Sequence, residues 1–343
     1  MAIEYENVLL GHGSGGIMMK RIIDEIFLEA YGGSSLKSGD DAAVLDVGAC
    51  EKLAFSTDSF VVTPHFFPGG DIGKLAMCGT INDVSTSGAE PIAISVSFIL
   101  EEGYPISDLK KICASMAEVA LSAGVEIVTG DTKVVNRGMC DGIFINTSGI
   151  GLIRENRNLS GRNCRPGDKV ILTGTLGDHG ITIMTQREGL NISSNVESDA
   201  APLNRLVRDV LAVAPNVRCF RDPTRGGLAS TLNEFSEQSQ VSMLIEESSV
   251  PVRDSVRGVC EMLGYDVFQV ANEGKFVIVV PENEAEDALL ACRRNKYGTD
   301  AQIIGEIQVV ESEEIGPKVY LETAFGSKRI LDMLVGEQLP RIC

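Results

Sequence analysis

The chain has 343 residues, enough for about two domains that each bury a core of their own. Its 48 acidic residues outnumber 30 Lys and Arg, which gives a formal net charge of −18. A surface of that charge repels phosphate backbones and anionic lipid, so we expect no nucleic-acid or membrane partner. The sequence also lacks a long apolar run and a secretory signal pattern, so we expect a cytoplasmic protein.

The first half of the chain alternates between helix-like and strand-like patterns. A glycine-rich loop at residues 11–16 precedes apolar residues at helical spacing, and that helix ends at Gly32 and Gly33. Further helices are predicted at residues 72–87 and 109–121, with a loop at residues 64–70. Strands are predicted at residues 42–47, 53–60, 91–100, 125–135 and 142–153.

A polar stretch at residues 154–168 predicts a domain boundary, and residues 191–199 are polar and predicted to be mobile. Helices are predicted at residues 203–213, 228–235 and 253–263, and strands at residues 169–175, 241–245, 267–270, 276–280 and 302–304. Because strands and helices mingle in both halves, we predict a two-lobed α/β (α+β) fold. Its domains would span residues 1–155 and 156–320, followed by a flexible tail at residues 321–343.

Nine cysteines are scattered along the sequence without a CxxC pair, so they predict neither a disulfide framework nor a structural zinc site. The last one, Cys343, closes the segment Pro340-Arg-Ile-Cys343, which follows an apolar stretch and Gly336. The seven residues after that glycine span at most about 25 Å, enough to carry a thiol into a pocket and out again. We therefore interpret this segment as a substrate arm on which the rest of the protein acts.

Two glycine motifs suggest nucleotide binding but do not fit the folds that normally carry them. The glycine spacing at residues 11–16 matches the dinucleotide fingerprint, yet no buried strand of sufficient length precedes it. Gly73-Lys74 resembles the end of a P-loop, but Pro68 stands at its first glycine position and Leu75 replaces Ser or Thr. Residues 11–16 could still form a loop whose backbone amides bind phosphate. Any ATP site in this protein must be of a kind other than a Rossmann fold or a P-loop.

Aspartates recur beside apolar or small residues, where an isolated carboxylate is costly unless it is paired or binds a metal. A single one could cap a turn or a helix, but several that converge in an acidic protein predict Mg²⁺ carrying a nucleotide triphosphate. Lys133 adds a positive group for phosphate. The aspartates concerned are Asp40, Asp41, Asp58, Asp83 and Asp131.

Two later motifs add an anion site and an acid. Residues 221–228 open a helix with two glycines and exposed amides, which predicts an anion site that Arg225 reinforces. An ordinary Asp-Pro turn with a glycine-rich cap is the alternative. Residues 271–275 place Glu273 in a tight turn between two predicted strands, a position where a carboxylate is usually solvated.

Taken together, these motifs resemble those of the ATP-dependent superfamily of aminoimidazole ribonucleotide synthetase and selenophosphate synthetase. Within it, the sequence is most similar to the family of the hydrogenase maturation protein HypE, along almost the whole chain. The similar segments are His12-Gly-Ser-Gly-Gly16, Phe55-Ser-Thr-Asp-Ser59, Phe66-Phe-Pro-Gly-Gly70, Ile72-Gly-Lys-Leu75, Asn82-Asp-Val84, Gly130-Asp-Thr-Lys-Val-Val135, Asp222-Pro-Thr-Arg-Gly-Gly227, Ala271-Asn-Glu-Gly-Lys275 and Pro340-Arg-Ile-Cys343.

The resemblance implies an aminoimidazole ribonucleotide synthetase-like fold, a homodimer formed by the N-terminal lobes, and ATP bound between the lobes with Mg²⁺. It implies that a partner carbamoyltransferase loads Cys343 with a carbamoyl group. The protein would then dehydrate this thiocarbamate with ATP to a thiocyanate. The cyanide would pass to iron held by a scaffold complex that builds the [NiFe]-hydrogenase centre.

The motifs and the resemblance together imply roles for single residues. Cys343 would accept the carbamoyl group, Glu273 would be the base, and Lys133 would stabilise charge or share that role. The predicted nucleotide ligands are Gly13, Ser14, Asp41, Thr57, Asp58, Asn82, Asp83, Thr129, Gly130, Asp131, Arg225 and Gly226. The predicted ligands of Mg²⁺, which screens the triphosphate charge, are Asp40, Asp58, Asp83, Asp131 and Asp222.

Two alternatives stay open. A selenophosphate synthetase-like kinase would share the architecture and the use of ATP, but it needs a reactive Cys or selenocysteine in residues 11–16, where none occurs. A non-catalytic carrier of a metal or a partner would use Cys343 as a ligand and the lobes as a scaffold. The clustered aspartates favour an enzyme, and an assay of ATP hydrolysis would discriminate between the two classes.

Overall fold

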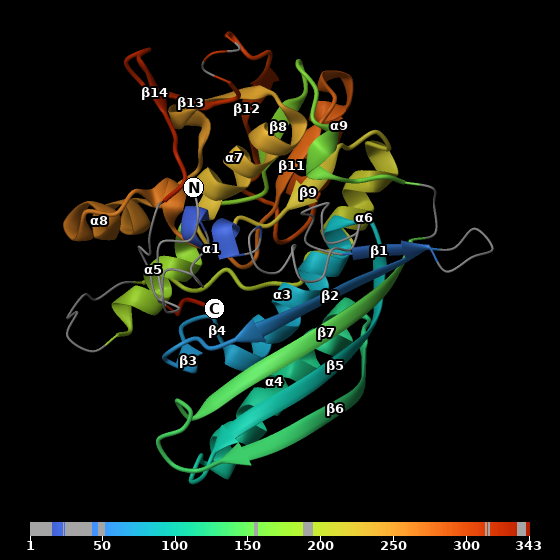
Figure 1. Ribbon diagram of the computed structural model, residues 1–343, viewed down its shortest axis with the longest axis vertical. Coiled ribbons are helices and arrows are strands. Elements are labelled where there is room, and N and C mark those ends of the chain that lie inside the picture. Colours follow the sequence, from blue (N-terminus) through green and yellow to red (C-terminus); the bar gives the residue numbers. More distant parts are fainter. Residues whose placement is uncertain are drawn as a thin grey trace.

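The computed structural model describes residues 16–22, 24, 43–46, 52–153, 157–187, 195–312, 314, 316–334 and 341–343. Over these ranges the chain forms two α/β domains, each built around its own β-sheet (Figure 1). This arrangement confirms the predicted two-lobed fold. Among the helices of these ranges, none combines the length and the apolar character that crossing a bilayer requires.

The N-terminal domain contains a five-stranded sheet in the order β1-β2-β7-β5-β6. Strands β5 and β6 are parallel and are linked through helix α4, whereas the other neighbours are antiparallel. Strand β7 alternates buried and half-buried residues, as expected when one face of a sheet is covered. The elements are β1 (Ala43–Asp46), β2 (Lys52–Phe60), β5 (Glu90–Glu101), α4 (Ile106–Ala123), β6 (Glu126–Val135) and β7 (Ile143–Ile153).

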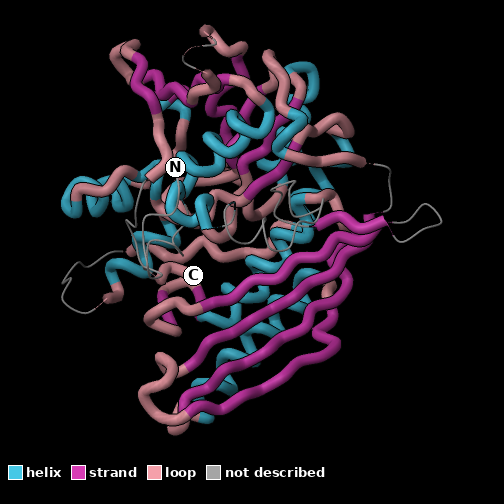
Figure 2. The backbone as a smooth tube through the Cα atoms, viewed as in Figure 1, coloured by secondary structure: helices cyan, strands magenta, loops and turns pink. Residues whose placement is uncertain are grey.

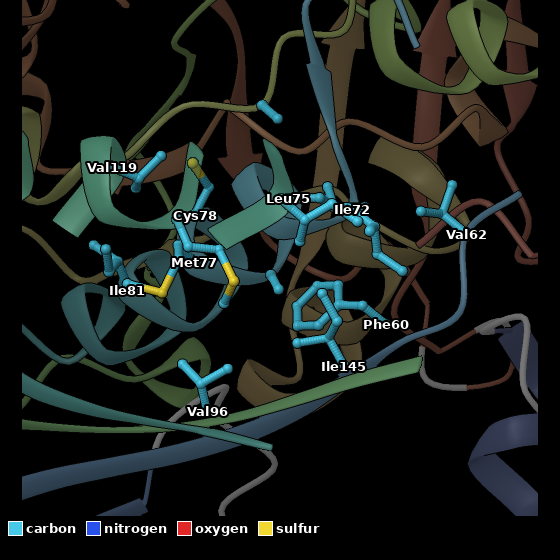
Figure 3. Packing of buried hydrophobic residues seen from close by; sticks show 14 of the residues in the cluster. Phe60, Val62, Ile72, Leu75, Met77, Cys78, Ile81, Val96, Val119 and Ile145 are labelled. Atoms are coloured by element: carbon cyan, nitrogen blue, oxygen red, sulfur yellow. The ribbon is translucent and has the colours of Figure 1, made fainter. Parts of the chain in front are cut away.

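Helices α3 (Ile72–Thr86) and α4 lie together on one face of this sheet (Figures 1 and 2). Their apolar side chains share a core with the sheet, in which Phe60 and Ile145 lie below α3 (Figure 3). Strand β7 permits this close packing because it has glycines under the helix. A Cβ at Gly151 would lie 2.5 Å from a methyl carbon of Val84. The close approach sets the second half of α3 beside β2.

The predicted loop at residues 64–70 contains a small hairpin of β3 (Phe66–Phe67) and β4 (Gly70–Asp71). It ends at Asp71, whose carboxylate accepts hydrogen bonds from the N–H groups of Gly73 and Lys74. This cap satisfies two of the free N–H groups at the start of α3 and fixes where the helix begins.

The C-terminal domain contains a seven-stranded sheet in the order β14-β13-β10-β12-β8-β11-β9. Helix α7 packs on one face, and helices α6 and α9 pack on the other. Strand β11 therefore reads as continuous apolar residues, because Val277 and Val279 enter one core while Ile278 and Val280 enter the other. The strands are β8 (Lys169–Leu172), β9 (Cys219–Arg221), β10 (Ser242–Glu246), β11 (Val277–Val280), β12 (Gln302–Gln308), β13 (Val319–Glu322) and β14 (Lys328–Ile330).

The remaining elements of the described ranges surround these two sheets. The helices are α1 (Gly16–Ile22), α5 (Asp178–Thr185), α6 (Asn204–Val213), α7 (Gly227–Ser239), α8 (Asp254–Leu263) and α9 (Ala285–Arg294). Short 3-10 helices are η4 (Gly161–Asn163), η5 (Glu247–Ser249), η6 (Val267–Gln269) and η7 (Glu282–Glu284). The helix predicted after the glycine loop lies mostly outside the described residues, which include its region only as α1 and residue 24.

Three predictions about local structure differ from the fold. The strand predicted at residues 267–270 is the 3-10 helix η6, because the Asp266 carboxylate accepts the N–H of Phe268 and turns the chain. The tail predicted from residue 321 begins inside β13, which pairs with β10 and β14. The segment predicted to be mobile ends in the buried Ser198 and in Asp199, whose side chain is 8 % exposed.

Candidate functional site

A cavity of about 180 Å³ lies where the two domains meet the C-terminal residues of the chain. Its lining is dominated by carboxylates, hydroxyl groups and one guanidinium. The N-terminal domain, the C-terminal domain and the terminal segment all contribute side chains. The lining residues are Ser56, Thr57, Asp58, Gly79, Asp83, Asp222, Thr224, Arg225, Glu273 and Cys343.

Strand β2 and helix α3 supply the N-terminal wall of the cavity. The Ser56 hydroxyl donates to the Asp83 carboxylate at 2.8 Å, which ties the strand to the helix. The Thr57 hydroxyl donates to the carbonyl oxygen of Thr147 on the neighbouring strand at 3.0 Å. Burial raises the pKa of Asp58, although the positive charge of Arg225 opposes the rise. This wall therefore presents two half-buried carboxylates to the cavity.

The segment that leads from β9 into α7 supplies part of the opposite wall. Gly226 and Gly227 have φ angles of +78° and +60°, in the left-handed region that favours glycine. A Cβ at Gly227 would lie 2.6 Å from the carbonyl oxygen of Phe268, so the turn also requires a residue without a side chain. The turn carries Arg225 to the cavity, where one guanidinium nitrogen lies 4.0 Å from Asp58. Cys343 in its thiolate form, which exists only at high pH, and after it the nearby carboxylates raise the pKa of Arg225.

Glu273 completes that wall from the turn between η6 and β11. Its side chain is 2 % exposed, and its Oε1 atom has no hydrogen-bond partner among the described residues. Burial raises the pKa of Glu273 well above its ordinary value, and the charges of Asp222, Asp199 and Asp58 raise it further. A buried carboxyl with a raised pKa that lines a cavity is suited to taking or giving a proton in a reaction.

The C-terminal residues enter the cavity and are held there by their backbone and by the side chains of Arg341 and Ile342; the Arg341 guanidinium donates to the carbonyl oxygen of Val61 at 3.0 Å. The N–H of Val61 donates to a backbone oxygen of Cys343 at 3.1 Å. His179 bonds through Nε2 to the carbonyl oxygen of Ile342 at 2.9 Å, and Arg187 donates to that of Arg341 at 2.9 Å. The Ile342 side chain is buried in the core of the N-terminal domain. We call residues 341–343 in this position the seated tail.

The seated tail keeps its sulfur neutral. Burial raises the pKa of Cys343 to about 12, and the neighbouring Glu273, Asp58 and Asp222 favour the rise while Arg225 opposes it. Because the thiolate is the nucleophilic form, the free thiol is a poor nucleophile in this position. The cavity is therefore suited to act on a group already attached to the sulfur.

Several predicted site residues meet in the cavity, although the sequence separates them widely. Those that line it are Thr57, Asp58, Asp83, Asp222, Arg225, Glu273 and Cys343, and Gly226 adjoins it. Four others, Gly13, Ser14, Asp40 and Asp41, lie outside the described residues. Within the described residues, no three His, Cys, Asp or Glu side chains are grouped as a metal site.

Strand β6 places its predicted ligands elsewhere. Nine of its ten residues are exposed, including Thr129, Gly130, Asp131 and Lys133. The Lys133 ammonium pairs with the Asp131 carboxylate at 2.6 Å instead of facing the cavity. In a single chain these residues do not line the cavity, because β6 lies at the edge of the sheet.

Asn82 also has a role that differs from the nucleotide contact predicted above. Its side chain is fully buried, and its amide nitrogen donates to the carbonyl oxygens of Ala201 at 3.0 Å and Glu273 at 3.3 Å. Its Oδ1 accepts the N–H of Leu203 at 2.8 Å. These three bonds join α3 to the C-terminal domain, so we call Asn82 the interdomain clasp.

No sequence pattern singled out Ser56, Thr224 or His179, and none indicated a role for Asp199. A hydroxyl beside an aspartate is too common a pattern to single out Ser56. His179 is one of three histidines, but a lone histidine is most often structural. Asp199 stands at the end of a polar segment, and only the contact of its side chain with Lys275, far along the chain, distinguishes it.

Comparison with known proteins agrees with this architecture. The model of the AIR synthase related protein N-terminal domain matches residues 39–153, and that of the C-terminal domain matches residues 165–317. The carbamoyl dehydratase HypE of Rhodobacter capsulatus is 49 % identical over 346 residues, which cover 100 % of both chains. The chain belongs to the HypE carbamoyl dehydratase family.

Solved structures give the same result. A HypE–HypF complex contains a chain that is 47 % identical, with a TM-score of 0.86, and the match covers 91 % of this chain and 99 % of that one. HypE in complex with ATP is 49 % identical, with a TM-score of 0.81 and coverage of 98 % and 100 %. At this identity and coverage the likeness includes both domains.

Proposed function

We propose that the protein is an ATP-dependent carbamoyl dehydratase of hydrogenase maturation. It would convert an S-carbamoyl group on Cys343 into a thiocyanate, which supplies the cyanide ligand for the iron of [NiFe]-hydrogenase. The observation that carries the proposal is the position of Cys343, in a cavity lined by Arg225, Glu273 and three aspartates. The family relatives that bear the name carbamoyl dehydratase support the same reaction.

The reaction uses ATP to remove the carbamoyl oxygen. That oxygen attacks the γ-phosphorus of ATP and releases ADP, which makes the carbon–oxygen bond breakable. The bond then breaks with its electron pair on the departing phosphate, and the loss of two N–H protons leaves a carbon–nitrogen triple bond. Glu273 fits the role of the base for these protons, because its buried carboxyl has a raised pKa. Arg225 fits the stabilisation of charge on the phosphoryl group.

Magnesium would enter together with the triphosphate. The carboxylates of Asp58, Asp83 and Asp222 are hard oxygen donors on the cavity wall, and they fit a cation that retains water and phosphate ligands. They would hold Mg²⁺, with the predicted contributions of Asp40 and Asp131 still to be tested. When bound, the ion would screen the negative charge of the phosphates.

The assembly would be a homodimer formed by the N-terminal domain, residues 1–155, which would also bind ATP and Mg²⁺. Support comes from the exposed edge strand β6, whose Ile127, Val128 and Val134 are 39 %, 55 % and 67 % exposed. An apolar edge strand with unpaired backbone groups is a template for pairing with another chain. Covering β6 in this way is also the arrangement that could give Lys133 a catalytic role.

The C-terminal domain, residues 156–320, and the following tail would present Cys343 to partners. A carbamoyltransferase, as in the solved HypE–HypF complex, would load the thiol. Loading requires the tail outside the cavity, because the seated sulfur is a neutral thiol. A scaffold complex that carries iron would then accept the cyanide, and these steps belong in the cytoplasm.

Intact mass of the loaded protein tests the proposal. The carbamoylated chain should gain about 43 Da and, after Mg-ATP, lose about 18 Da as one water leaves the covalent intermediate. Peptide mapping should place both changes on Cys343, and Cys343→Ala should show neither. Loss of the 18 Da without ATP, or its location on another cysteine, would overturn the proposal. A carrier would bind the group without this loss, and a selenophosphate synthetase-like kinase would consume ATP with selenide instead.

A further inference from the structure

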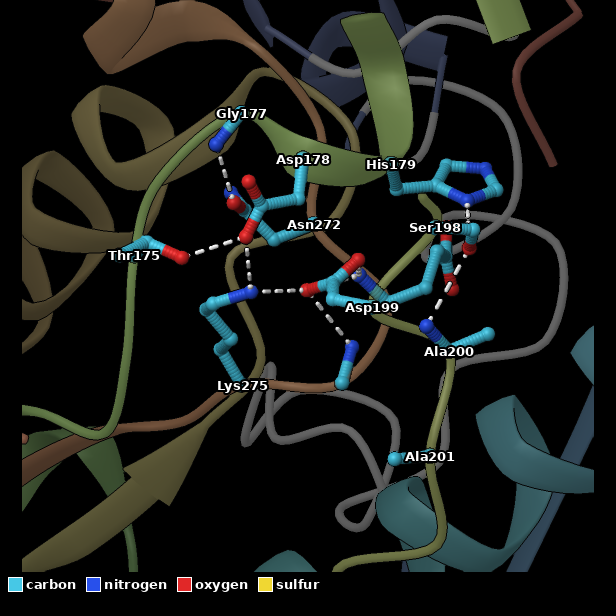
Figure 4. Close-up of polar contacts among 12 residues, drawn as sticks. Thr175, Gly177, Asp178, His179, Ser198, Asp199, Ala200, Ala201, Asn272 and Lys275 are labelled. Carbon is cyan, nitrogen blue, oxygen red and sulfur yellow. Dashed lines mark hydrogen bonds and ion pairs between the residues drawn. The ribbon is translucent and has the colours of Figure 1, made fainter. Parts of the chain in front are cut away.

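A buried ion network of Lys275, Asp178 and Asp199 (Figure 4) adjoins the turn that carries Glu273, because Asp199 accepts the N–H of Glu273. The Lys275 ammonium lies between two carboxylates, 3.1 Å from Asp178 and 2.7 Å from Asp199. All three side chains are less than a tenth exposed. Buried charges are costly to desolvate and are normally retained only where each has partners. The network therefore needs an explanation of its own, because the chemistry proposed above does not require it.

Asp199 connects the network to the turn that carries Glu273. Its carboxylate accepts the N–H of Glu273 at 3.2 Å and the N–H of Gly274 at 3.1 Å. A Cβ at Gly274 would lie 1.8 Å from the backbone carbonyl oxygen of Asp199, so only glycine allows the two segments to approach this closely. The backbone N–H groups of Glu273 and of the next residue are thus both held by the Asp199 carboxylate.

The residue before Asp199 connects the same segment to the seated tail. The Ser198 hydroxyl bonds to His179 Nδ1 at 2.8 Å and accepts the N–H of Ala200 at 3.2 Å (Figure 4). His179 Nε2 in turn bonds to the carbonyl oxygen of Ile342 at 2.9 Å. Residues 198–200 therefore contact the turn of the proposed base directly, and they are linked to the backbone next to the reacting cysteine through His179.

The charge of Asp199 is maintained despite its burial. Burial alone would raise the pKa of Asp199, but Lys275 and His179 together hold it below the ordinary value. The carboxylate is therefore ionised at neutral pH and accepts both backbone N–H groups strongly. A neutral side chain at this position would keep the space filled but would hold the turn less firmly.

We propose that Asp199 is a positioning residue for the dehydration at Cys343, because it fixes the Glu273 turn while Ser198 orients the histidine that binds the tail. This inference rests on the function proposed above. Asp199 does not line the cavity, so it acts through Glu273 and not on the reacting atoms. A misplacement of a reacting group by about 1 Å can cost roughly 100-fold in rate, which sets the scale of the effect.

The test compares Asp199→Asn with the unmodified protein in single-turnover dehydration. Carbamoylated protein is mixed with Mg-ATP, and the loss of water is followed by mass over time. The rate constant at saturating ATP should fall roughly 10- to 100-fold. The ATP concentration that gives half the maximal rate should stay within about twofold, because Asp199 does not line the cavity.

Asp168→Asn is the matched control. Asp168 is also a buried carboxylate that pairs with a cation, Arg218 at 3.0 Å, and accepts a backbone N–H, that of Arg165 at 2.8 Å. Asp168 directly precedes the first residue of β8, whereas Asp178 of the network lies beyond the last residue of that strand. This variant should lose stability to a similar extent and keep the unmodified rate constant.

A second variant covers the case in which Asp199→Asn does not fold. Asp199→Ser removes the charge without placing an amide N–H₂ group against Lys275, which keeps Asp178 as its partner. It should show the same fall in rate constant. If the folded Asp199 variants match Asp168→Asn in rate, or if they change only the ATP dependence, the positioning role is refuted. If the unmodified protein itself never loses water with ATP, the proposed function fails instead.

Discussion

The seating of the tail can be tested by shortening one side chain, Ile342. This side chain is 3 % exposed and belongs to the apolar core of the N-terminal domain. When the tail leaves the cavity, the same side chain is in water. Ile342→Ala therefore weakens the seated state and leaves the rest of the fold almost unaffected.

The magnitude follows from core substitutions of the same kind. Replacing a buried isoleucine by alanine costs about 2–5 kcal/mol, and the lower part of this range applies where the surroundings can relax. A cost of about 2–3 kcal/mol multiplies the population of the released tail roughly 30- to 150-fold, since each 1.4 kcal/mol is about tenfold. The positive φ angle of Arg341, +51°, already disfavours the seated backbone, so the contacts must offset that strain as well.

Alkylation of thiols measures the released population. The seated Cys343 has a pKa of about 12 against 9.0 for an ordinary cysteine, so its thiolate fraction near pH 8 is lower by roughly a thousandfold. Labelling of Cys343 therefore reports the released tail. Cys113, which is exposed on α4, serves as an internal reference. We expect the ratio of Cys343 to Cys113 labelling, read by peptide mass spectrometry, to rise roughly 30- to 150-fold in Ile342→Ala.

Ile307→Ala is the control for this experiment. Ile307 is 2 % exposed, but it lies in the core of the C-terminal domain and does not belong to the core that holds Ile342. It should lower the melting temperature without changing the labelling ratio. An unchanged ratio in Ile342→Ala, with Cys113 labelled normally, would show that the Ile342 side chain does not hold the tail.

Three further predictions concern the walls and the edge of the N-terminal sheet. The pKa of Glu273 is raised in the folded state, so the folded state binds more protons than the unfolded state and its stability falls as pH rises. Glu273→Gln should therefore melt at a higher temperature than the unmodified protein at pH 8 and lose that difference near pH 4. The same variant should have no dehydration activity. Asp83→Asn can still accept the Ser56 hydroxyl, so a folded variant should hydrolyse Mg-ATP roughly 100-fold more slowly. Val128→Lys should give a monomer in sedimentation measurements, and an intact dimer would exclude β6 as its interface.

The sequence predicted most reliably those elements in which the pattern of apolar and polar residues reflects which faces are buried. Strand β11 is apolar throughout because both its faces are buried, and α4 shows an apolar face at helical spacing with Gly124 at its end. Helix α5 was missed because all eight of its residues are buried, including Asp178 and His179, so no polar face marks its period. The 3-10 helix η6 was predicted as a strand because its apolar residues look the same in either conformation.

The site was predictable as a set of residues but not as an arrangement. The motifs contain Asp58, Asp83, Arg225 and Glu273, and the cavity brings all four together. The exposure of Lys133 depends on the position of β6 at the sheet edge, which follows from strand order and not from local sequence. The burial of Asp199 depends on contacts with residues more than 70 positions away, so no local pattern could identify it.

The interdomain clasp limits how the cavity can open. A small separation of the domains that admits no water would break the three hydrogen bonds of Asn82 and leave its amide without partners, at about 1–3 kcal/mol for each buried group left unsatisfied. Release of the tail also breaks hydrogen bonds, but the freed backbone carbonyl groups then form hydrogen bonds to water. Access to the cavity is therefore expected to be gated by the last three residues, while Asp83 and Glu273 keep a fixed separation. Such a protein can present the group on Cys343 to different partners while the residues of its cavity keep their arrangement.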